Sequence, residues 1–454
     1  MSKTNVTTIT PATSFVDSDS FLGIVGGKLV PISAENLKKG LIQNNDLYLN
    51  QIAFYIEPNV AQGTDTKINK GGSSYMFSTW EAQWKPCLMD KDGNYTQLSE
   101  SDFHYTEDGV QCADLSTGEV MSDFKKCNFM ILPPKTYGYL QTISVSGVSK
   151  VRLWLSLVPI PGGFEMEQAT ADGLFKGSID ANGALRSLPN KVTADSKTIM
   201  QFFSAAQLFG KDFGLAGGLF RDIMYYRMNY KYGTRDSQNA TASDGTAVWG
   251  VGLDGTESAS STDKFVAQKN ITTGKTMTLG KSDGKVAVTD AKGDTVHCVS
   301  CLGIENPWGQ KWEMDGHRGC VGSVLYHWAS NFMPQTTLSA STFTNVNHRE
   351  LARATSNGQP GLQNIVTTEG NQFADIIPTN IGTTGISSGD YFNYDPNGQL
   401  VLWGGYSNYA SYCGLRCAYS SYAWSASDSS ISARLDYHGA IKKVTTTQLK
   451  ALAA

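Results

Sequence analysis

The stretch GIENPWGQKWE at residues 303–313 decides the fold. It holds two tryptophans, Trp308 and Trp312, and two glutamates, Glu305 and Glu313, in one short glycine-punctuated segment. Large aromatic rings supply the apolar area that a fold with little regular structure needs. We therefore expect both tryptophans to lie in the core and both glutamates to be buried hydrogen-bonding partners.

Outward from this stretch, other residues suit the same scaffold. Trp328, Trp403 and Trp424 would add to the aromatic core. Gly404-Gly405 would end a strand in a backbone geometry that residues with a Cβ resist. We interpret these residues as scaffold and not as a site.

The composition favours a β-rich, loop-rich extracellular protein. Of 454 residues, 40% are hydrophobic and only 17% are charged, while Gly (46) and Tyr (20) are abundant. The net charge is -4 and no basic stripe is present, which excludes the clustered electrostatic footprint of a nucleic-acid-binding protein. No long apolar run and no apolar signal core occur, so we expect no membrane insertion.

Cysteine usage predicts no metal centre and no cofactor. The eight cysteines are Cys87, Cys112, Cys127, Cys298, Cys301, Cys320, Cys413 and Cys417. Cys298 and Cys301 have the spacing of a zinc or redox pair, but zinc would need a second pair with similar spacing. Cys413 and Cys417 have no histidine beside them at ligand spacing. We expect reduced and mostly buried thiols.

The pattern along the chain predicts an α+β protein with a small separate N-terminal part. Residues 1–45 should form strand, tight turn and strand over 18–32 and a short helix over 33–39, a piece too small to bury a core alone. Residues 46–454 should form one domain. Its helices are expected within 195–232, where apolar residues recur at helical spacing, and its clearest strand at 151–157. We interpret 235–297 as an inserted, exposed hairpin made by 276–279 and 286–288.

The most informative tract is YSNYASYCGLRCAYSSYAWSASDSSIS, residues 406–432. About half of it is Tyr and Ser, the composition of an antibody paratope, in which Tyr gives large amphipathic contact area for little entropy. We predict that its polar and aromatic side chains bind a ligand and that substitutions among them leave the fold intact. These are Tyr406, Ser407, Asn408, Tyr409, Ser411, Tyr412, Tyr419, Ser420, Ser421, Tyr422, Ser425, Ser427, Asp428 and Ser430. The alternative is a low-complexity surface strand and loop.

These motifs together resemble a known family. GIENPWGQKWE is similar to the Gly-Asn-x-Trp-Glu core of formylglycine-generating-enzyme-type C-type-lectin folds, with Gln310 where Asn is usual. Further matches follow in order along residues 50–440: Gly162-Gly163-Phe164-Glu165, Leu185-Arg186-Ser187-Leu188-Pro189, Tyr232-Gly233-Thr234-Arg235-Asp236-Ser237-Gln238, Asp390-Tyr391-Phe392, Leu402-Trp403-Gly404-Gly405, Cys413-Gly414-Leu415 and Ile431-Ser432-Ala433-Arg434-Leu435. The chain looks like a variable protein of a diversity-generating retroelement. That resemblance implies many short strands, one or two helices, long loops and a variable region at 400–440.

The retroelement resemblance adds a coding argument. Such elements randomise adenines, and changing the first two bases of AAC reaches Tyr, Ser, Asp, Ala, Cys, Gly, His, Thr and Asn. Nearly every residue of the tract belongs to that set. The exceptions, Leu415, Trp424 and Ile431, are expected to be fixed scaffold, as is Arg416.

The resemblance implies a receptor-binding protein of a phage or prophage virion, located at the tail or fibre tip. It would be made in the bacterial cytoplasm, released by lysis, bound to other tail proteins through residues 1–45, and assembled as a homotrimer. Its partner would be a bacterial surface protein or glycan. A structural tail-fibre or capsid-surface component without a receptor role is the alternative. We do not expect an oxidase at Cys413 and Cys417, because no histidine lies beside them. We do not expect a calcium lectin at Glu57-Pro58-Asn59 either, because its Trp-Asn-Asp partner is absent.

Overall fold

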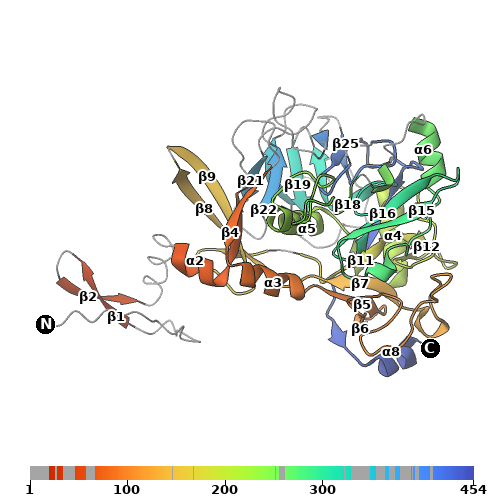
Figure 1. The fold of residues 1–454 in the computed structure, drawn as a ribbon, viewed down its shortest axis with the longest axis horizontal. Coiled ribbons are helices and arrows are strands. Elements are labelled where there is room, and N and C mark those ends of the chain that lie inside the picture. The colour runs from red at the N-terminus through yellow and green to blue at the C-terminus, as the bar shows by residue number, and fades with distance from the viewer. Residues whose placement is uncertain are drawn as a thin grey trace.

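A computed structural model gives the arrangement of the chain (Figure 1). It describes residues 20–25, 28–33, 46–57, 67–145, 147–166, 168–250, 252–254, 261–321, 324–328, 348–353, 363–367, 374–378, 390, 392–393, 398–409 and 413–453. Many short strands in several sheets, together with short helices, make it a mixed α+β protein, as the sequence predicts.

The expectation of one or two helices is wrong. Within the described ranges the α-helices are α2 (Asp46–Ile52), α3 (Ser74–Ala82), α4 (Ile199–Phe209), α5 (Gly218–Tyr232), α6 (Ser261–Gln268) and α8 (Thr446–Ala453). Only α4 and α5 are long enough to show clear helical periodicity in the sequence. The others are short, and such helices depend on tertiary packing and caps. In α3, for example, the Ser73 side chain accepts the Met76 N–H, and Phe77 and Trp80 are buried.

The N-terminal hairpin is confirmed. Strands β1 (Ser20–Val25) and β2 (Lys28–Ser33) pair antiparallel and form a two-stranded sheet of their own. Figure 1 draws this hairpin apart from the other sheets. Ser33, the predicted N-cap of a helix over 33–39, is the last residue of β2, and residues 34–39 lie outside the described residues.

The five-stranded sheet lies on the side of the molecule nearest the N-terminal hairpin (Figure 1). The five-stranded sheet has the order β10 (Phe164–Glu165), β8 (Tyr137–Val145), β9 (Val148–Ser156), β3 (Phe54–Glu57), β4 (Asn69–Gly72). The first seven-stranded sheet has the order β14 (Phe213–Leu215), β27 (Arg434–Tyr437), β11 (Ala171–Lys176), β7 (Asn128–Leu132), β5 (Lys85–Met89), β6 (Asn94–Gln97), β28 (Lys442–Lys443). The C-terminal strand β27 therefore lies between β14 and β11, two strands from the first half of the chain.

A second seven-stranded sheet carries the tract. Its order is β20 (His348–Arg353), β19 (Val324–Trp328), β18 (Trp312–Val321), β24 (Leu400–Trp403), β25 (Ala418–Tyr422), β23 (Phe392–Asn393), with β26 (Ile431–Ser432) pairing parallel to the start of β18. Small sheets complete the fold: β12 (Ser178–Ile179) with β13 (Leu185–Arg186), β21 (Gln363–Thr367) with β22 (Ala374–Pro378), and β15 (Gly284–Thr289), β16 (Thr295–Cys301) and β17 (Ile304–Glu305).

The predicted hairpin at 276–288 has a different partner. Strand β15 contains residues 286–288, but it pairs with β16, while Met277–Leu279 is the 3-10 helix η3. The other 3-10 helices are η1 (Ser122–Phe124) and η2 (Gly252–Asp254). The region is also less exposed than expected, because Trp249 and Met277 are fully buried in the main core. Their burial shows that parts of 235–297 supply core residues.

Helix α5 crosses the centre of the molecule (Figure 1). It buries nearly all of its residues, including Ile223, Met224 and Tyr226. The helix ends at Gly233, whose φ of 66° is left-handed and whose N–H donates to Asn229 O. One large hydrophobic cluster includes α5, and a second includes α4, β14, β18, β24 and β27. The second cluster lies directly under the tract.

Candidate functional site

The tract leaves the sheet through two left-handed glycines. Strand β24 ends at Trp403, and Gly404 and Gly405 follow with φ of 87° and 78°. A Cβ on Gly405 would lie 2.4 Å from Cys413 Sγ, so the backbone here approaches the far end of the loop too closely for a side chain. The predicted role of this glycine pair is confirmed. The sharp exit brings the first tyrosines of the tract back over β18.

A β-bulge in β25 sets the direction of two tyrosines. Leu402 pairs with Tyr419 and Leu400 pairs with Tyr422, so three steps on β25 oppose two steps on β24. In a regular strand, residues three apart point to opposite faces. The extra residue turns the strand and lets Tyr419 and Tyr422 lie on the same face, with ring centroids 5.6 Å apart. Sequence alternation alone could not reveal this, because a bulge leaves no periodic pattern.

The tyrosines of the tract form one aromatic patch, which we define as Tyr406, Tyr409, Tyr419 and Tyr422. All four are half-buried, and Trp312, which is 2% exposed, lies beneath them. The Trp312 ring centroid is 4.9 Å from that of Tyr409, 5.7 Å from that of Tyr419 and 6.3 Å from that of Tyr406. The Tyr406 and Tyr409 centroids are 5.3 Å apart. Residues distant in sequence thus share a continuous ring surface.

Helix α6 adds a residue that sequence reasoning missed. The Phe265 ring lies 5.5 Å from the Tyr406 ring in an edge-on arrangement and is also half-buried. Phe265 belongs to the segment interpreted as an inserted hairpin, and no pattern in the sequence connects it with the tract. It extends the aromatic patch to the α6 edge.

The remaining predicted binding residues divide into three groups. Ser425, Ser427 and Asp428 are exposed, while Asn408 and Ser421 are half-buried. Ser407, Ser420 and Ser430 are buried and do not form part of the exposed surface of the tract. Ser430, for example, donates its Oγ–H to Asp428 Oδ1 at 2.7 Å. Ser411 and Tyr412 lie outside the described residues.

The middle of the tract is fixed by buried charge. Arg416 is 5% exposed and pairs through Nη1 with Asp222 on α5, and Arg318 on β18 pairs with the same carboxylate. The Arg416 N–H also donates to Asp390 Oδ2 at 3.0 Å. Its guanidinium lies 5.2 Å from the Trp403 ring centroid. Arg416 is therefore scaffold, as predicted.

The other expected scaffold residues are confirmed where they are described. Leu415 and Ile431 are completely buried, and Trp308, Trp403 and Trp424 are buried as well. Trp328 lies in β19, but its burial is not described. These residues give the tract a rigid base on both sides of the aromatic patch.

Both glutamates of residues 303–313 are buried partners, as predicted. Glu305 accepts the N–H groups of Gly274 and Thr276, each at 2.8 Å. Glu313 pairs with Arg434, Arg221 and Lys176, each at 2.9 Å. Burial raises the pKa of Glu313, but these three cations outweigh burial and hold the pKa below its ordinary value. The carboxylate therefore stays charged and joins β18, β27, β11 and α5.

Gln310 occupies a strained backbone position. Gln310 has a left-handed φ of 63°, a conformation in which Asn is enriched among residues that carry a Cβ. Its buried side chain donates to Ile271 O at 2.8 Å. This bond to the loop after α6 fixes the strained position.

Alternative sites were tested by the positions of their residues. All eight cysteines are buried thiols. Cys298 and Cys301 stand three apart on β16 and belong to different hydrophobic clusters, so they do not form a ligand pair. Burial raises the pKa of both well above its ordinary value. Glu57 is 4% exposed and bonded to Arg152 and Asn69. Pro58 and Asn59 lie outside the described residues.

One group of side chains has metal-ligand chemistry, and the sequence analysis missed it. His317 on β18, Asp436 on β27 and His438 just after β27 each present one ligand atom, and these atoms lie within 4.8 Å of one another. Both imidazoles contact the same carboxylate oxygen, Asp436 Oδ2. His317 stands 119 residues from Asp436, so no sequence spacing indicates the group.

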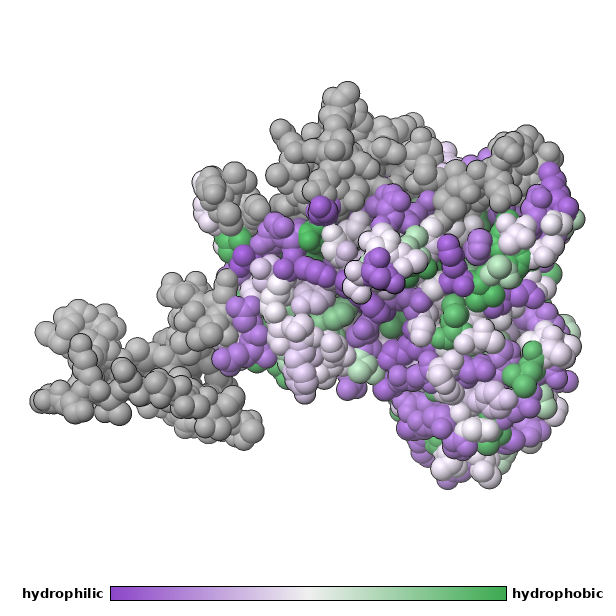
Figure 2. Space-filling model, in the orientation of Figure 1, coloured by the Kyte–Doolittle hydropathy of each residue, from purple (hydrophilic) through white to green (hydrophobic). Residues whose placement is uncertain are grey.

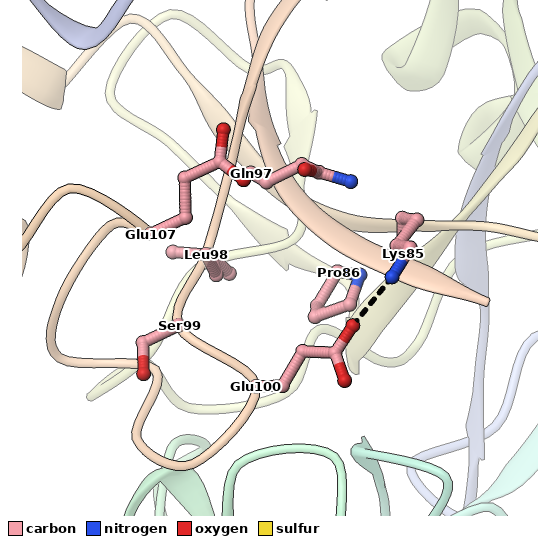
Figure 3. A pocket seen from close by; sticks show the side chains of 7 residues that line it. All are labelled: Lys85, Pro86, Gln97, Leu98, Ser99, Glu100 and Glu107. Atoms are coloured by element: carbon pink, nitrogen blue, oxygen red, sulfur yellow. Dashed lines mark hydrogen bonds and ion pairs between the residues drawn. The ribbon is translucent and has the colours of Figure 1, made fainter. Parts of the chain in front are cut away.

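A small surface pocket lies elsewhere, beside β5 and β6. It has a volume of about 210 Å³ and is lined by Lys85, Pro86, Gln97, Leu98, Ser99, Glu100 and Glu107. Figure 3 shows the Lys85 ammonium facing the Glu100 carboxylate, at 2.7 Å. Glu107 is likewise paired with Lys443. Because its charged side chains are already in ion pairs, this pocket offers little attraction to a charged ligand.

On the face in Figure 2, hydrophobic residues form small areas scattered among hydrophilic ones. Among the described helices, none has the length and apolar character needed to span a bilayer. Scanning family models and searching curated proteins gives no match to this chain.

Proposed function

We propose that this chain is a receptor-binding protein of a phage or prophage virion, and that the aromatic patch with its exposed neighbours binds a bacterial surface ligand. The observation that carries the proposal is the patch itself. Four tyrosines from a Tyr/Ser-rich tract lie together over one buried tryptophan, although they come from two separate backbone segments.

The chemistry of the patch suits adaptable recognition. The half-buried tyrosines keep part of each ring packed and leave the rest exposed. Such rings offer a large contact area and lose little entropy on binding. Exposed Ser425 and Ser427 lie in the same tract and add small polar groups. Because Arg416 and Trp312 hold the base, side chains above them can differ without changes in the base.

We also propose a C-type-lectin-like fold and a diversity-generating retroelement as the origin of the tract. The confirmed burial of Trp308, Trp312 and Glu313 supports this fold, as does the tract's location between β24 and β26. Flanking DNA provides a direct check. A near-copy of the codons for residues 400–440 and a reverse transcriptase gene should lie beside this gene.

Residues 1–45 are proposed as the attachment and assembly end of a homotrimer on the tail or fibre. Hairpin β1–β2 is only two-stranded, and edge strands invite pairing with another chain. Linking several copies raises apparent affinity by roughly 10²–10⁴ if the geometry allows simultaneous binding. Light scattering on the whole chain and on one starting at residue 46 tests this. A full-length monomer that binds as strongly as the virion would contradict it.

The binding test compares variants that remove tyrosine rings, variants that remove only the hydroxyls, and a variant of a tyrosine outside the tract. Binding of the purified full chain to cells from a panel of bacterial strains would be measured by flow cytometry. Changing Tyr409 and Tyr419 together to Ser should lower binding at least about tenfold, because hot-spot residues at an interface contribute about 2 kcal/mol or more. Changing both to Phe keeps the ring packing and isolates the hydroxyls.

The matched control is Tyr75→Ser. Tyr75 is 74% exposed on α3, outside the tract, and its loss should leave binding unchanged. If the Ser variants stay folded and bind every strain as the unchanged chain does, the receptor role fails. The structural alternative, a tail-fibre or capsid-surface component, would then be favoured.

A further inference from the structure

The buried group His317, Asp436 and His438 is the strongest unexplained feature of the described chain. His317 Nε2 lies 2.9 Å and His438 Nε2 lies 2.8 Å from Asp436 Oδ2. The side chains of all three are at most 3% exposed. Two imidazoles and a carboxylate thus converge on one point that is closed to solvent.

We propose that this group binds one divalent transition-metal ion of the zinc class, with His317 Nε2, His438 Nε2 and Asp436 Oδ2 as ligands. Imidazole nitrogen and carboxylate oxygen bind zinc at roughly 2.0–2.2 Å, so ligand atoms around a tetrahedral ion lie roughly 3.3 Å apart. The observed separations of 2.8 and 2.9 Å need to widen by only about half an ångström to admit the ion.

A second carboxylate supports a cation at this point. Asp172 on β11 is the register partner of Asp436 on β27 and is 1% exposed. One oxygen of each carboxylate, Oδ1, is buried and has no hydrogen-bond partner among the described residues. Two adjacent buried carboxylates repel each other, and a buried charge needs a compensating partner. Arg434 offsets part of the charge at Asp172. With neutral imidazoles, a divalent ion would offset the rest.

On the other side of Asp436, glycines let the main chain approach the group closely. Gly214 on β14 is its register partner there, and a Cβ on Gly214 would lie 2.8 Å from Asp436 Oδ1. Gly217 packs against His317 in the same manner, with a Cβ 2.8 Å from the ring. These two glycines let main chain approach the group closely. Small shifts of the carboxylate toward or away from the ion therefore meet no side chain at Gly214.

The ion would join the two seven-stranded sheets. His317 belongs to β18 in the sheet that carries the tract, and Asp436 belongs to β27 in the other. Strand β27 starts two residues after β26, where the tract returns to the sheet. Because the group is closed to solvent, its role is structural: the ion fixes the outgoing end of the tract and is incorporated as the chain folds.

Metal content and spectroscopy test the site directly. The full chain would be unfolded, freed of metal by a chelator and refolded with Zn²⁺ or Co²⁺. We expect one equivalent of metal by mass spectrometry, a tetrahedral Co²⁺ absorption band, and two imidazole nitrogens around zinc by X-ray absorption. These measurements need no variant. An unchanged spectrum and no stoichiometric metal would overturn the proposal and favour two imidazolium–carboxylate pairs.

Variants sharpen the assignment. Changing His317 and His438 together to Gln should lower zinc affinity at least about 100-fold, since even outer partners of metal ligands matter by 10–100-fold. The control is His104→Gln, because His104 is also buried against a carboxylate, Asp102, but has no second imidazole there. Zinc retained by the double variant at full affinity would exclude these ligands. If the double variant does not fold, the cobalt band of the unchanged chain decides.

Discussion

Two parts of one tract are held in different ways. Residues 413–418 are buried, and Arg416 ties them to Asp222 and Asp390. The tyrosines on either side are only half-buried and contact one another and Trp312 through ring edges and faces. The amino-acid composition does not distinguish the buried part from the half-buried part, because Tyr, Ser, Ala and Cys occur throughout the tract. Exposure is decided by the charge network and the glycine exit beneath the tract, and not by composition.

The largest effect is expected at the boundary between the two parts. Trp312→Ala removes the ring beneath the aromatic patch and should lower the free energy of unfolding by about 3–5 kcal/mol, as buried Trp truncations do. Urea denaturation measures this loss, and Trp424→Ala is a second buried case. A fully stable Trp312→Ala variant would mean that the aromatic patch does not depend on the Trp312 ring beneath it.

The buried anchor comes next. Arg416→Met leaves one buried guanidinium, Arg318, on Asp222 and should cost about 3 kcal/mol, the lower end for breaking a buried pair. Lys211→Met, at an exposed lysine, is the control and should change stability by less than about 0.5 kcal/mol. If both substitutions lowered stability equally, Arg416 would not stabilise the tract more than an exposed residue does.

Asp390 gives the anchor a pH dependence. Burial, with the charge of Asp236, raises its pKa to about 7, so the folded chain keeps a proton that the unfolded chain releases above 3.8. Stability from this group is full at low pH and is lost as the pH rises to 7. Between pH 5 and 7 the loss should be roughly 2 kcal/mol. Asp390→Asn should flatten this slope in urea titrations, and an unchanged slope would assign it to another group.

The smallest effect is expected in the aromatic patch. Tyr419→Ser removes a half-buried ring and should cost about 1 kcal/mol, whereas Tyr419→Phe should stay within about 0.5 kcal/mol. Thermal melts of the two variants measure the difference. A loss above about 3 kcal/mol for Tyr419→Ser would place this tyrosine with the core and remove it from the proposed binding surface.

Local chemistry made the scaffold predictable from sequence. Trp308, Trp312 and Glu313 have few roles outside a core, and Gly404-Gly405 indicates left-handed backbone directly. The helical spacing of 195–232 likewise gave α4 and α5. The short helices α3 and α6 could not be predicted, because caps and packing stabilise them more than periodicity does.

The site was predictable in composition but not in geometry. The tract contains the four tyrosines of the patch, yet nothing in it separates exposed Ser425 from buried Ser407 and Ser420. Phe265 joins the patch through the packing of α6, and His317 meets Asp436 through the packing of two sheets. Such meetings depend on tertiary structure and leave no trace in local spacing.

The bulge in β25 has a consequence for how this surface can change over generations. Three residue steps along β25 span the same length as two steps along β24, and this extra residue places Tyr419 and Tyr422 on one face. Replacing either side chain leaves the number of residues in β25 unchanged, so different side chains can occupy these two positions without altering the strand. Deleting one residue would restore even pairing and turn Tyr422 toward the opposite face. The surface should therefore tolerate substitutions but not insertions or deletions in β25.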